Sequence, residues 1–196
     1  MKNKHIGILL GGWGSEREIS IKSGNAVFQA LQEMGYEATI INFDRNIVKK
    51  LQDINPDIIF NALHGKFGED GKIQAIFELL KIPYTHSSVL ASALAMDKIK
   101  TRELCAIYGI KNPKYQVIHK NQDKKNQEII NIIGNPFVLK PINEGSSRGV
   151  EIIISGQNFS AKDINWQYGS EIIIEQYIKG REISVAILQD KAIGAI

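Results

Sequence analysis

The feature that most constrains the fold is a short apolar run at residues 6–10, which ends directly in Gly11 and Gly12. A continuous apolar run of this length, ended by glycines, is typical of a strand buried in a parallel sheet. A helical pattern follows it, and Gly35 is a suitable C-cap for that helix. The apolar face expected for this helix contains Ile19, Val27, Leu31 and Met34.

Strands and helices continue to alternate through the first part of the chain. We expect strands at residues 38–43 and 58–63 and a helix at residues 73–80. Strands that alternate with helices indicate a parallel sheet with helical crossovers. Residues 1–95 are therefore predicted to form a Rossmann-like α/β domain, in which the ligand-binding loops follow the carboxyl ends of the strands.

The pattern changes after Asp97 and Lys98, where a helix is expected to run as far as Tyr108. Few helical segments separate the strands that follow, and one of them covers residues 128–133. The strands are expected at residues 115–118, 137–140, 150–154, 171–175 and 183–188. Closely spaced strands of this kind indicate an α+β unit with a mostly antiparallel sheet, which we place at residues 96–180.

Composition narrows the range of functions. The 196 residues are 43% hydrophobic and 23% charged, as in an ordinary globular protein, and carry a net charge of +3 that is spread along the chain. The densest basic stretch, residues 120–125, favours a solvated turn over a nucleic-acid patch. Cys105 is the single cysteine, which excludes an internal disulfide framework. With no signal peptide and no apolar run of about 18 residues, we expect a cytoplasmic protein that contacts no membrane.

The first candidate binding loop covers residues 11–18, between the first strand and its helix. Glycines let a backbone approach a ligand closely, and a helix N-terminus favours an anion. The loop matches two positions of the dinucleotide pattern G-x-G-x-x-G, but Arg17 stands at the third. Asp44 is placed to bind a ribose, so a nicotinamide enzyme remains an alternative. Glu16 suits an ammonium group better than a phosphate, or it complements the helix dipole.

The second candidate loop covers residues 64–71, at the end of a predicted strand. Three glycines and charges of both signs are typical of a binding loop. It does not match the Walker A pattern G-x-x-x-x-G-K-[ST]. His64 is either a ligand-binding or a structural histidine, and the sequence pattern leaves both interpretations open.

Two further loops lie between strands of the second unit. In residues 140–149, Lys140 offers a positive charge, and a Gly-Ser-Ser turn offers amides and hydroxyls that can surround a phosphate. A plain polar hairpin is the alternative interpretation. In residues 175–182, an acid, an aromatic residue and a second acid have a spacing that could hold an adenosine.

Taken together and in this order, the loops resemble the D-alanine–D-alanine ligase family over residues 4–196. The matching runs are LLGGWGSEREIS, NALHGKFGEDGKIQ, ASALAMDK, KPINEGSSRGV and IIEQYIKGREISVAI. Five ordered motifs are far more specific than any single one. The resemblance implies an ATP-grasp enzyme: a Rossmann-like pre-ATP-grasp domain, a central ATP-grasp subdomain, and at residues 181–196 the start of a truncated C-terminal subdomain.

The resemblance also implies a reaction, the ATP-dependent ligation of two D-alanines to D-alanyl-D-alanine for peptidoglycan precursor synthesis. ATP would phosphorylate the carboxylate of the first D-alanine, and the amine of the second would attack the acyl phosphate. Glu16 would bind the ammonium of the first D-alanine, and His64 would lie beside its carboxylate. Ser146 would orient Glu16 and cover the reacting centre, so Glu16 and Ser146 are the catalytic candidates.

An ATP site is implied in the same way. Lys98 and Lys140 would bind phosphates and neutralise the charge that develops in transfer. Residues 175–178 would line the adenine pocket, and Glu182 would hold the ribose. The full expected set is Lys98, Lys140, Glu144, Ser146, Ser147, Glu175, Gln176, Tyr177, Ile178 and Glu182. Gln176 stands where many relatives have lysine, at a position that can act through its backbone.

The resemblance places the Mg²⁺ ligands in a C-terminal part that this chain lacks, so we expect no metal ligand here and no useful activity from residues 1–196 alone. It also implies a homodimer formed through the first domain. The choice of D-alanine, D-lactate or D-serine as second substrate is left open. Two alternatives remain: a non-catalytic module that binds a nucleotide or an amino acid, and another ATP-grasp carboxylate–amine ligase.

Overall fold

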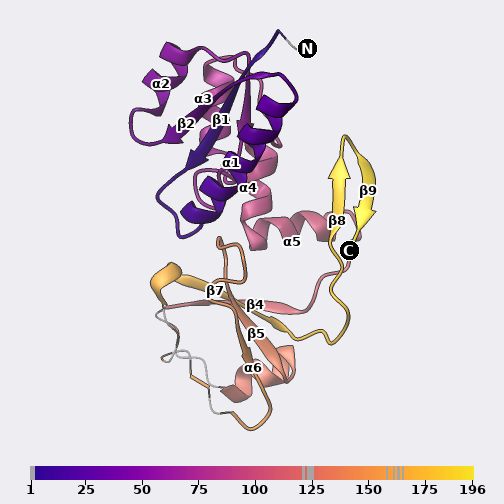
Figure 1. The fold of residues 1–196 in the computed structure, drawn as a ribbon. Coiled ribbons are helices and arrows are strands. Elements are labelled where there is room, and N and C mark those ends of the chain that lie inside the picture. The colour runs from indigo at the N-terminus through magenta and orange to yellow at the C-terminus, as the bar shows by residue number, and fades with distance from the viewer. Residues whose placement is uncertain are drawn as a thin grey trace.

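The computed structural model describes residues 3–120, 122, 126–157, 159–160, 162, 164 and 166–196. Within these residues the strands form three separate sheets, which follow one another along the chain (Figure 1). The three sheets fall within the ranges 1–95, 96–180 and 181–196 that we expect for the domains. The exact domain boundaries stay a prediction.

The N-terminal unit is the predicted parallel α/β structure. Its strands pair in the order β2-β1-β3, and both pairings are parallel. The core between sheet and helices contains fully buried Leu9, Leu51 and Phe77. The elements are β1 (His5–Gly11), α1 (Arg17–Glu33), β2 (Glu37–Phe43), α2 (Ile47–Ile54), β3 (Ile58–Asn61) and α3 (Lys72–Leu79).

Helix α1 packs on the sheet through small residues, so the apolar face that we expected for it is partly wrong. Its buried residues are Ser20 and Gly24, whereas Ile19 and Met34 are 51% and 59% exposed. A Cβ atom at Gly24 would lie 2.8 Å from the Cβ atom of Leu10, too close for any other residue to fit without movement. Close packing of Gly24 against β1 therefore makes the small residues the most buried ones, while Val27 and Leu31 of the expected face are partly buried.

The central unit is the predicted mostly antiparallel structure. Its four strands pair in the order β4-β7-β5-β6, and every pairing is antiparallel. Buried Ile118, Ile129, Phe137 and Leu139 belong to the core on one face of this sheet. Helix α4 (Val89–Met96) leads into this unit. The elements of the unit are α5 (Lys98–Ile107), β4 (Tyr115–His119), α6 (Asn126–Ile133), β5 (Phe137–Pro141), β6 (Glu151–Ile153), the 3-10 helix Trp166–Tyr168 and β7 (Glu171–Gln176).

The last sheet is a two-stranded hairpin of β8 (Val185–Leu188) and β9 (Lys191–Ala195). Figure 1 shows it beside α5 and apart from the other two sheets, and all its residues are exposed. None of the helices in the described part of the chain is long and apolar enough to cross a membrane. Residues 121 and 123–125 of the basic stretch lie outside the described residues.

Candidate functional site

The loops of the N-terminal and central units meet at Glu16. Ser146 donates a hydrogen bond from Oγ to Oε1 of Glu16, at 2.5 Å, although the two residues are 130 positions apart. Arg148 donates a second hydrogen bond, from Nη2 to the carbonyl oxygen of Ser15, at 3.0 Å. Loop 144–149 of the central unit is therefore docked on loop 11–18 of the N-terminal unit.

Loop 64–71 lies against the same carboxylate. A Cβ atom at Gly65 would be 2.5 Å from Oε2 of Glu16, at the movable end of that side chain, and the φ of Gly65 is +62°, a conformation that favours glycine. Next to it, Nδ1 of His64 is 3.8 Å from Oε1 of Glu69. Nε2 of His64 is buried without a hydrogen-bond partner among the described residues. Glu16 and Ser146 are thus in contact, and His64 is adjacent to them through Gly65.

An aromatic cluster, which the sequence patterns did not reveal, holds these two N-terminal loops together. The ring of Trp13 lies edge-on to Phe43 at 4.9 Å and to Phe67 at 5.4 Å between centroids. Trp13 belongs to loop 11–18, Phe67 to loop 64–71, and Phe43 ends β2. Edge-to-face pairs of this kind are stabilising, so the cluster fixes the loop that carries Glu16 relative to the loop that carries His64.

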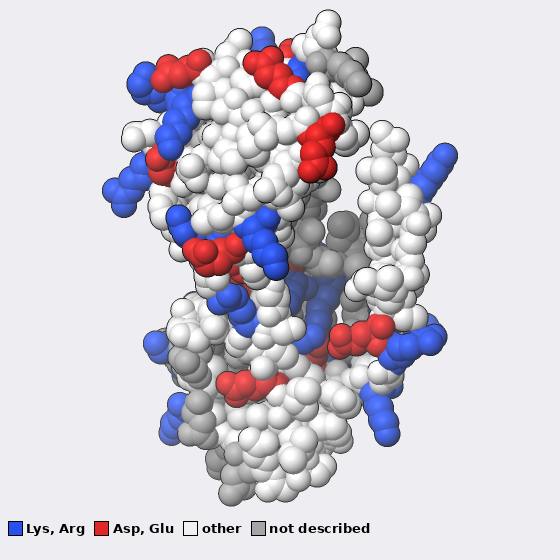
Figure 2. Space-filling model, in the orientation of Figure 1, with Lys and Arg blue, Asp and Glu red and all other residues white. Residues whose placement is uncertain are grey.

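A cavity of about 640 Å³ opens in the central unit. All ten residues expected to bind ATP line it: Lys98, Lys140, Glu144, Ser146, Ser147, Glu175, Gln176, Tyr177, Ile178 and Glu182. In the space-filling view the surface is hollowed between the two units and the hairpin, with basic and acidic side chains in the hollow (Figure 2). The structure therefore brings together in one cavity residues that are up to 84 positions apart.

The cavity also has an apolar wall that the motifs did not include. Val138 pairs with Ile152 on one side and with Glu175 on the other, so a row of side chains crosses three strands on the cavity face of the sheet. The alternation along β5 contains the signal for this wall, because Phe137 and Leu139 face the core. Such a wall suits the flat face of a heterocyclic base.

Glu175 is the centre of a buried ionic network in this wall. Its Oε1 lies 2.5 Å from Nζ of Lys140, and its Oε2 is paired with Arg102. Burial raises the pKa of Glu175, but hydrogen bonds from Lys140 and Arg102 outweigh it and hold that pKa below its ordinary value. Arg102 was not a sequence candidate, although it lies one helical turn after Lys98 on α5 and so on the same face.

Lys98 stands at the start of α5, where Asp97 caps the helix by accepting hydrogen bonds from two backbone amides. Its Nζ donates to the carbonyl oxygen of Glu144 at 2.5 Å and to that of Ile142 at 3.3 Å. Burial, and then the neighbouring charge of Lys140, lower the pKa of Lys98. An anion bound here would offset both effects, which makes this lysine suited to a phosphate.

A second hollow of about 440 Å³ shares Lys98, Glu144 and Gly145 with the first cavity. It adds Glu69 and His86, and His86 was not a sequence candidate. Burial lowers the pKa of His86, while the charge of Glu69 acts in the opposite direction. The two hollows therefore adjoin at Lys98, near the place where the loops of the two units meet.

The chain is similar to known ligases along nearly its whole length. Family models described as D-ala D-ala ligase N-terminus and D-ala D-ala ligase C-terminus match residues 46–87 and 104–196. A D-alanine–D-alanine ligase of Rickettsia felis is 45% identical over 193 residues, which are 98% of this chain and 59% of that protein.

Solved structures give the same result. The D-alanine–D-alanine ligase of Bacillus anthracis matches with a TM-score of 0.84 and 34% identity, over 98% of this chain and 63% of the other. The ATP complex of the Bacillus anthracis ligase matches with a TM-score of 0.83 and 33% identity, over 98% and 65%. This chain spans about three-fifths of the length of the curated relatives that it matches.

Proposed function

We propose a function from the premise that this chain belongs to the D-alanine–D-alanine ligase family of ATP-grasp enzymes. The protein that contains it joins two D-alanines to D-alanyl-D-alanine in an ATP-dependent reaction. The product would serve peptidoglycan precursor synthesis. Because the chain covers 59% of its curated relatives, the activity is proposed for the protein as a whole.

The observation that carries this proposal is the position of Ser146. This serine lines the cavity of about 640 Å³ and also donates a hydrogen bond to Glu16. A nucleotide in the cavity and an amino acid bound at Glu16 would therefore meet across one side chain. That is the arrangement needed to transfer a phosphoryl group from ATP to the carboxylate of the amino acid, because transfer depends mainly on positioning and charge stabilisation.

The residues around this meeting point have complementary roles in the proposal. Glu16 binds the ammonium group of the first D-alanine, and His64 lies beside its carboxylate. Lys98 and Lys140 neutralise the charge that develops on the phosphates. The apolar wall and residues 175–178 hold the adenine, and Glu182 holds the ribose.

Magnesium is expected in a phosphoryl transfer from ATP. Among the residues that the structure describes, no group of three or more His, Cys, Asp or Glu could hold a metal ion. We propose that the magnesium ligands lie in a part of the protein outside this chain, and no step within this chain is assigned to the metal.

We also propose that the protein acts in the cytoplasm as a homodimer formed through the N-terminal unit. Ile19 on α1 and Met34, directly after it, are exposed apolar side chains that such a contact could cover. Light scattering of the purified protein tests the stoichiometry, and a monomer at micromolar concentration would refute it.

The test of the function is phosphate release from Mg·ATP by the full-length protein, with D-alanine as substrate and L-alanine as control. We expect release that depends on D-alanine and a ninhydrin-positive dipeptide in equal amount. Tight nucleotide binding without turnover by the full-length protein would instead identify a binding module and refute the ligase proposal.

A further inference from the structure

Loop 144–149, which lines the nucleotide cavity, has a strained backbone. Two consecutive residues that are not glycine, Ser146 and Ser147, have φ values of +50° and +54°. L-residues rarely adopt this left-handed conformation, because Cβ approaches the following carbonyl oxygen. Such strain persists only where surrounding contacts hold the segment in place, so the contacts of this loop determine its shape.

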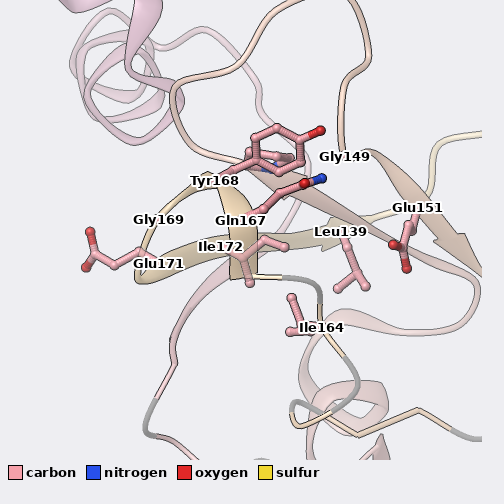
Figure 3. Close-up of a pocket in the computed structure, with 10 residues that line it drawn as sticks. Leu139, Gly149, Glu151, Ile164, Gln167, Tyr168, Gly169, Glu171 and Ile172 are labelled. Carbon is pink, nitrogen blue, oxygen red and sulfur yellow. The ribbon is translucent and has the colours of Figure 1, made fainter.

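Both ends of the loop are anchored within the central unit. At Gly149, with φ of +64°, a Cβ atom would lie 2.5 Å from Cε2 of Tyr168 and 2.8 Å from Cγ of Pro141. Figure 3 shows the ring of Tyr168 directly beside Gly149. At the other end, Lys98 donates its hydrogen bond to the carbonyl of Glu144. These anchors fix the ends. The middle is closed into a turn by a hydrogen bond from the backbone amide of Arg148 to the carbonyl oxygen of Gly145, at 3.1 Å, and it also contacts the N-terminal unit.

Two hydrogen bonds tie the middle of the loop to loop 11–18. One is the bond from Ser146 to Glu16, which belongs to the site already described. The other, from Arg148 to the carbonyl of Ser15, holds the backbone from which Glu16 projects. Nε of Arg148 is buried without a partner among the described residues. Burying a hydrogen-bond donor without a partner costs free energy, and the Arg148 side chain would avoid that cost if it turned into water. Its buried position therefore indicates that the guanidinium has a role in this loop.

We propose that Arg148 is a positioning residue that couples nucleotide binding to the binding of the first D-alanine. A nucleotide in the cavity touches Gly145, Ser146 and Ser147 and so restricts the loop. Through Arg148, the same restriction fixes Ser15 and the orientation of Glu16. Because such coupling is reciprocal, each ligand increases the affinity of the other by the same factor. This inference rests on the proposed function of the site.

The test measures the dissociation constant of D-alanine for the full-length protein, with and without a non-hydrolysable ATP analogue. We expect the analogue to tighten D-alanine binding to the wild type, and this gain to shrink about tenfold in Arg148→Ala, since one hydrogen bond from a charged donor is lost. Affinity for the analogue alone should stay within about twofold of the wild type, because Arg148 does not line the cavity.

Two further variants separate position from charge. Arg148→Lys keeps the charge and part of the reach, so it should recover part of the coupling. Lys49→Ala removes one positive charge from an exposed ion pair with Asp53 on α2 and should behave as the wild type.

Undiminished coupling in Arg148→Ala would overturn the inference, and so would an equal loss of affinity for the analogue alone, which would mark a purely structural role. A wild type that binds neither ligand would instead overturn the proposed function, and the inference with it.

Discussion

The substitution Glu175→Gln removes one charge from the centre of the ionic network and leaves two cations facing a neutral amide. Glu175 is only 4% exposed, and the side chains of Arg102 and Lys140 that pair with it are 12% and 29% exposed. Breaking a buried ion pair from one side costs about 3–5 kcal/mol, because the remaining charge is uncompensated. Lys140 can turn partly into water, so the lower end, about 3 kcal/mol, is the expected loss.

That loss is large against a total folding stability of about 5–15 kcal/mol. Hydrogen exchange of the β7 backbone amides reports it locally, because these amides are protected by sheet pairing on both sides of the strand. With about 1.4 kcal/mol for each factor of ten, protection in Glu175→Gln should fall about 10²-fold. The matched control is Glu171→Gln on the same strand, where the ion pair with His119 is 3.1 Å long and half-exposed, so protection should change less than about fivefold. Protection in Glu175→Gln within about threefold of the wild type would refute the reasoning.

The same carboxylate predicts a dependence on pH with a definite sign. The pKa of Glu175 is lowered in the folded protein from its ordinary value of 4.5, because the hydrogen bonds from Lys140 and Arg102 outweigh the opposing effect of burial. Its stabilising contribution is therefore complete above about pH 4.5 and is lost as the pH falls through the folded-state pKa. The difference in β7 protection between wild type and Glu175→Gln should shrink on acidification. A difference that grows towards acid pH would contradict this sign.

Three further predictions concern the site. Glu16→Gln should raise the KM for D-alanine about 10²-fold and leave ATP affinity unchanged. Glu18→Gln should change neither, because Glu18 is 83% exposed and forms its ion pair with the adjacent Arg17. Equal losses for both substrates in steady-state kinetics would contradict this prediction. Residues 1–196 alone should form ADP in response to D-alanine at least about 10²–10³ times more slowly than the full-length protein, and robust turnover by the isolated chain would refute the fragment proposal. ATP binding at alkaline pH should be accompanied by uptake of a proton at Lys98, because bound phosphate raises the pKa of Lys98 that burial lowers. Calorimetry in two buffers of different ionisation enthalpy measures this proton uptake, and Lys98→Met should abolish it.

Local sequence patterns predicted most strands, because the predicted apolar runs end at residues that favour turns and the folded chain turns at those residues. Helix α2 was missed although Ile47 and Leu51, one turn apart, are both buried. Helix α4, with the sequence VLASALAM, is apolar all round, so its periodicity contains no signal for orientation or start. On α1, the most buried residues were missed because Gly24 packs closely against β1.

The site was predictable to the extent that its residues follow strand ends in recognisable motifs. Arg102 and the apolar wall were missed because their partners are set by strand register: Val138 lies opposite Glu175 only once β5 and β7 have paired. The aromatic cluster of Trp13, Phe43 and Phe67 likewise depends on three separate strand ends meeting at one edge. Long-range pairing of this kind leaves no mark within a short window of sequence.

The two halves of the proposed site differ in what they require of the fold. The residues that line the nucleotide cavity all lie between Lys98 and Glu182, so the central unit and the segment after β7 form it without the N-terminal unit. Glu16 comes from the N-terminal unit, and its contact with Ser146 exists only when the two units are docked. A change that loosens the docking should therefore weaken binding of the amino acid before binding of the nucleotide. The strained loop 144–149 is the one segment shared by both halves within the described residues, so the contacts of its middle residues set the geometry in which phosphate and carboxylate meet.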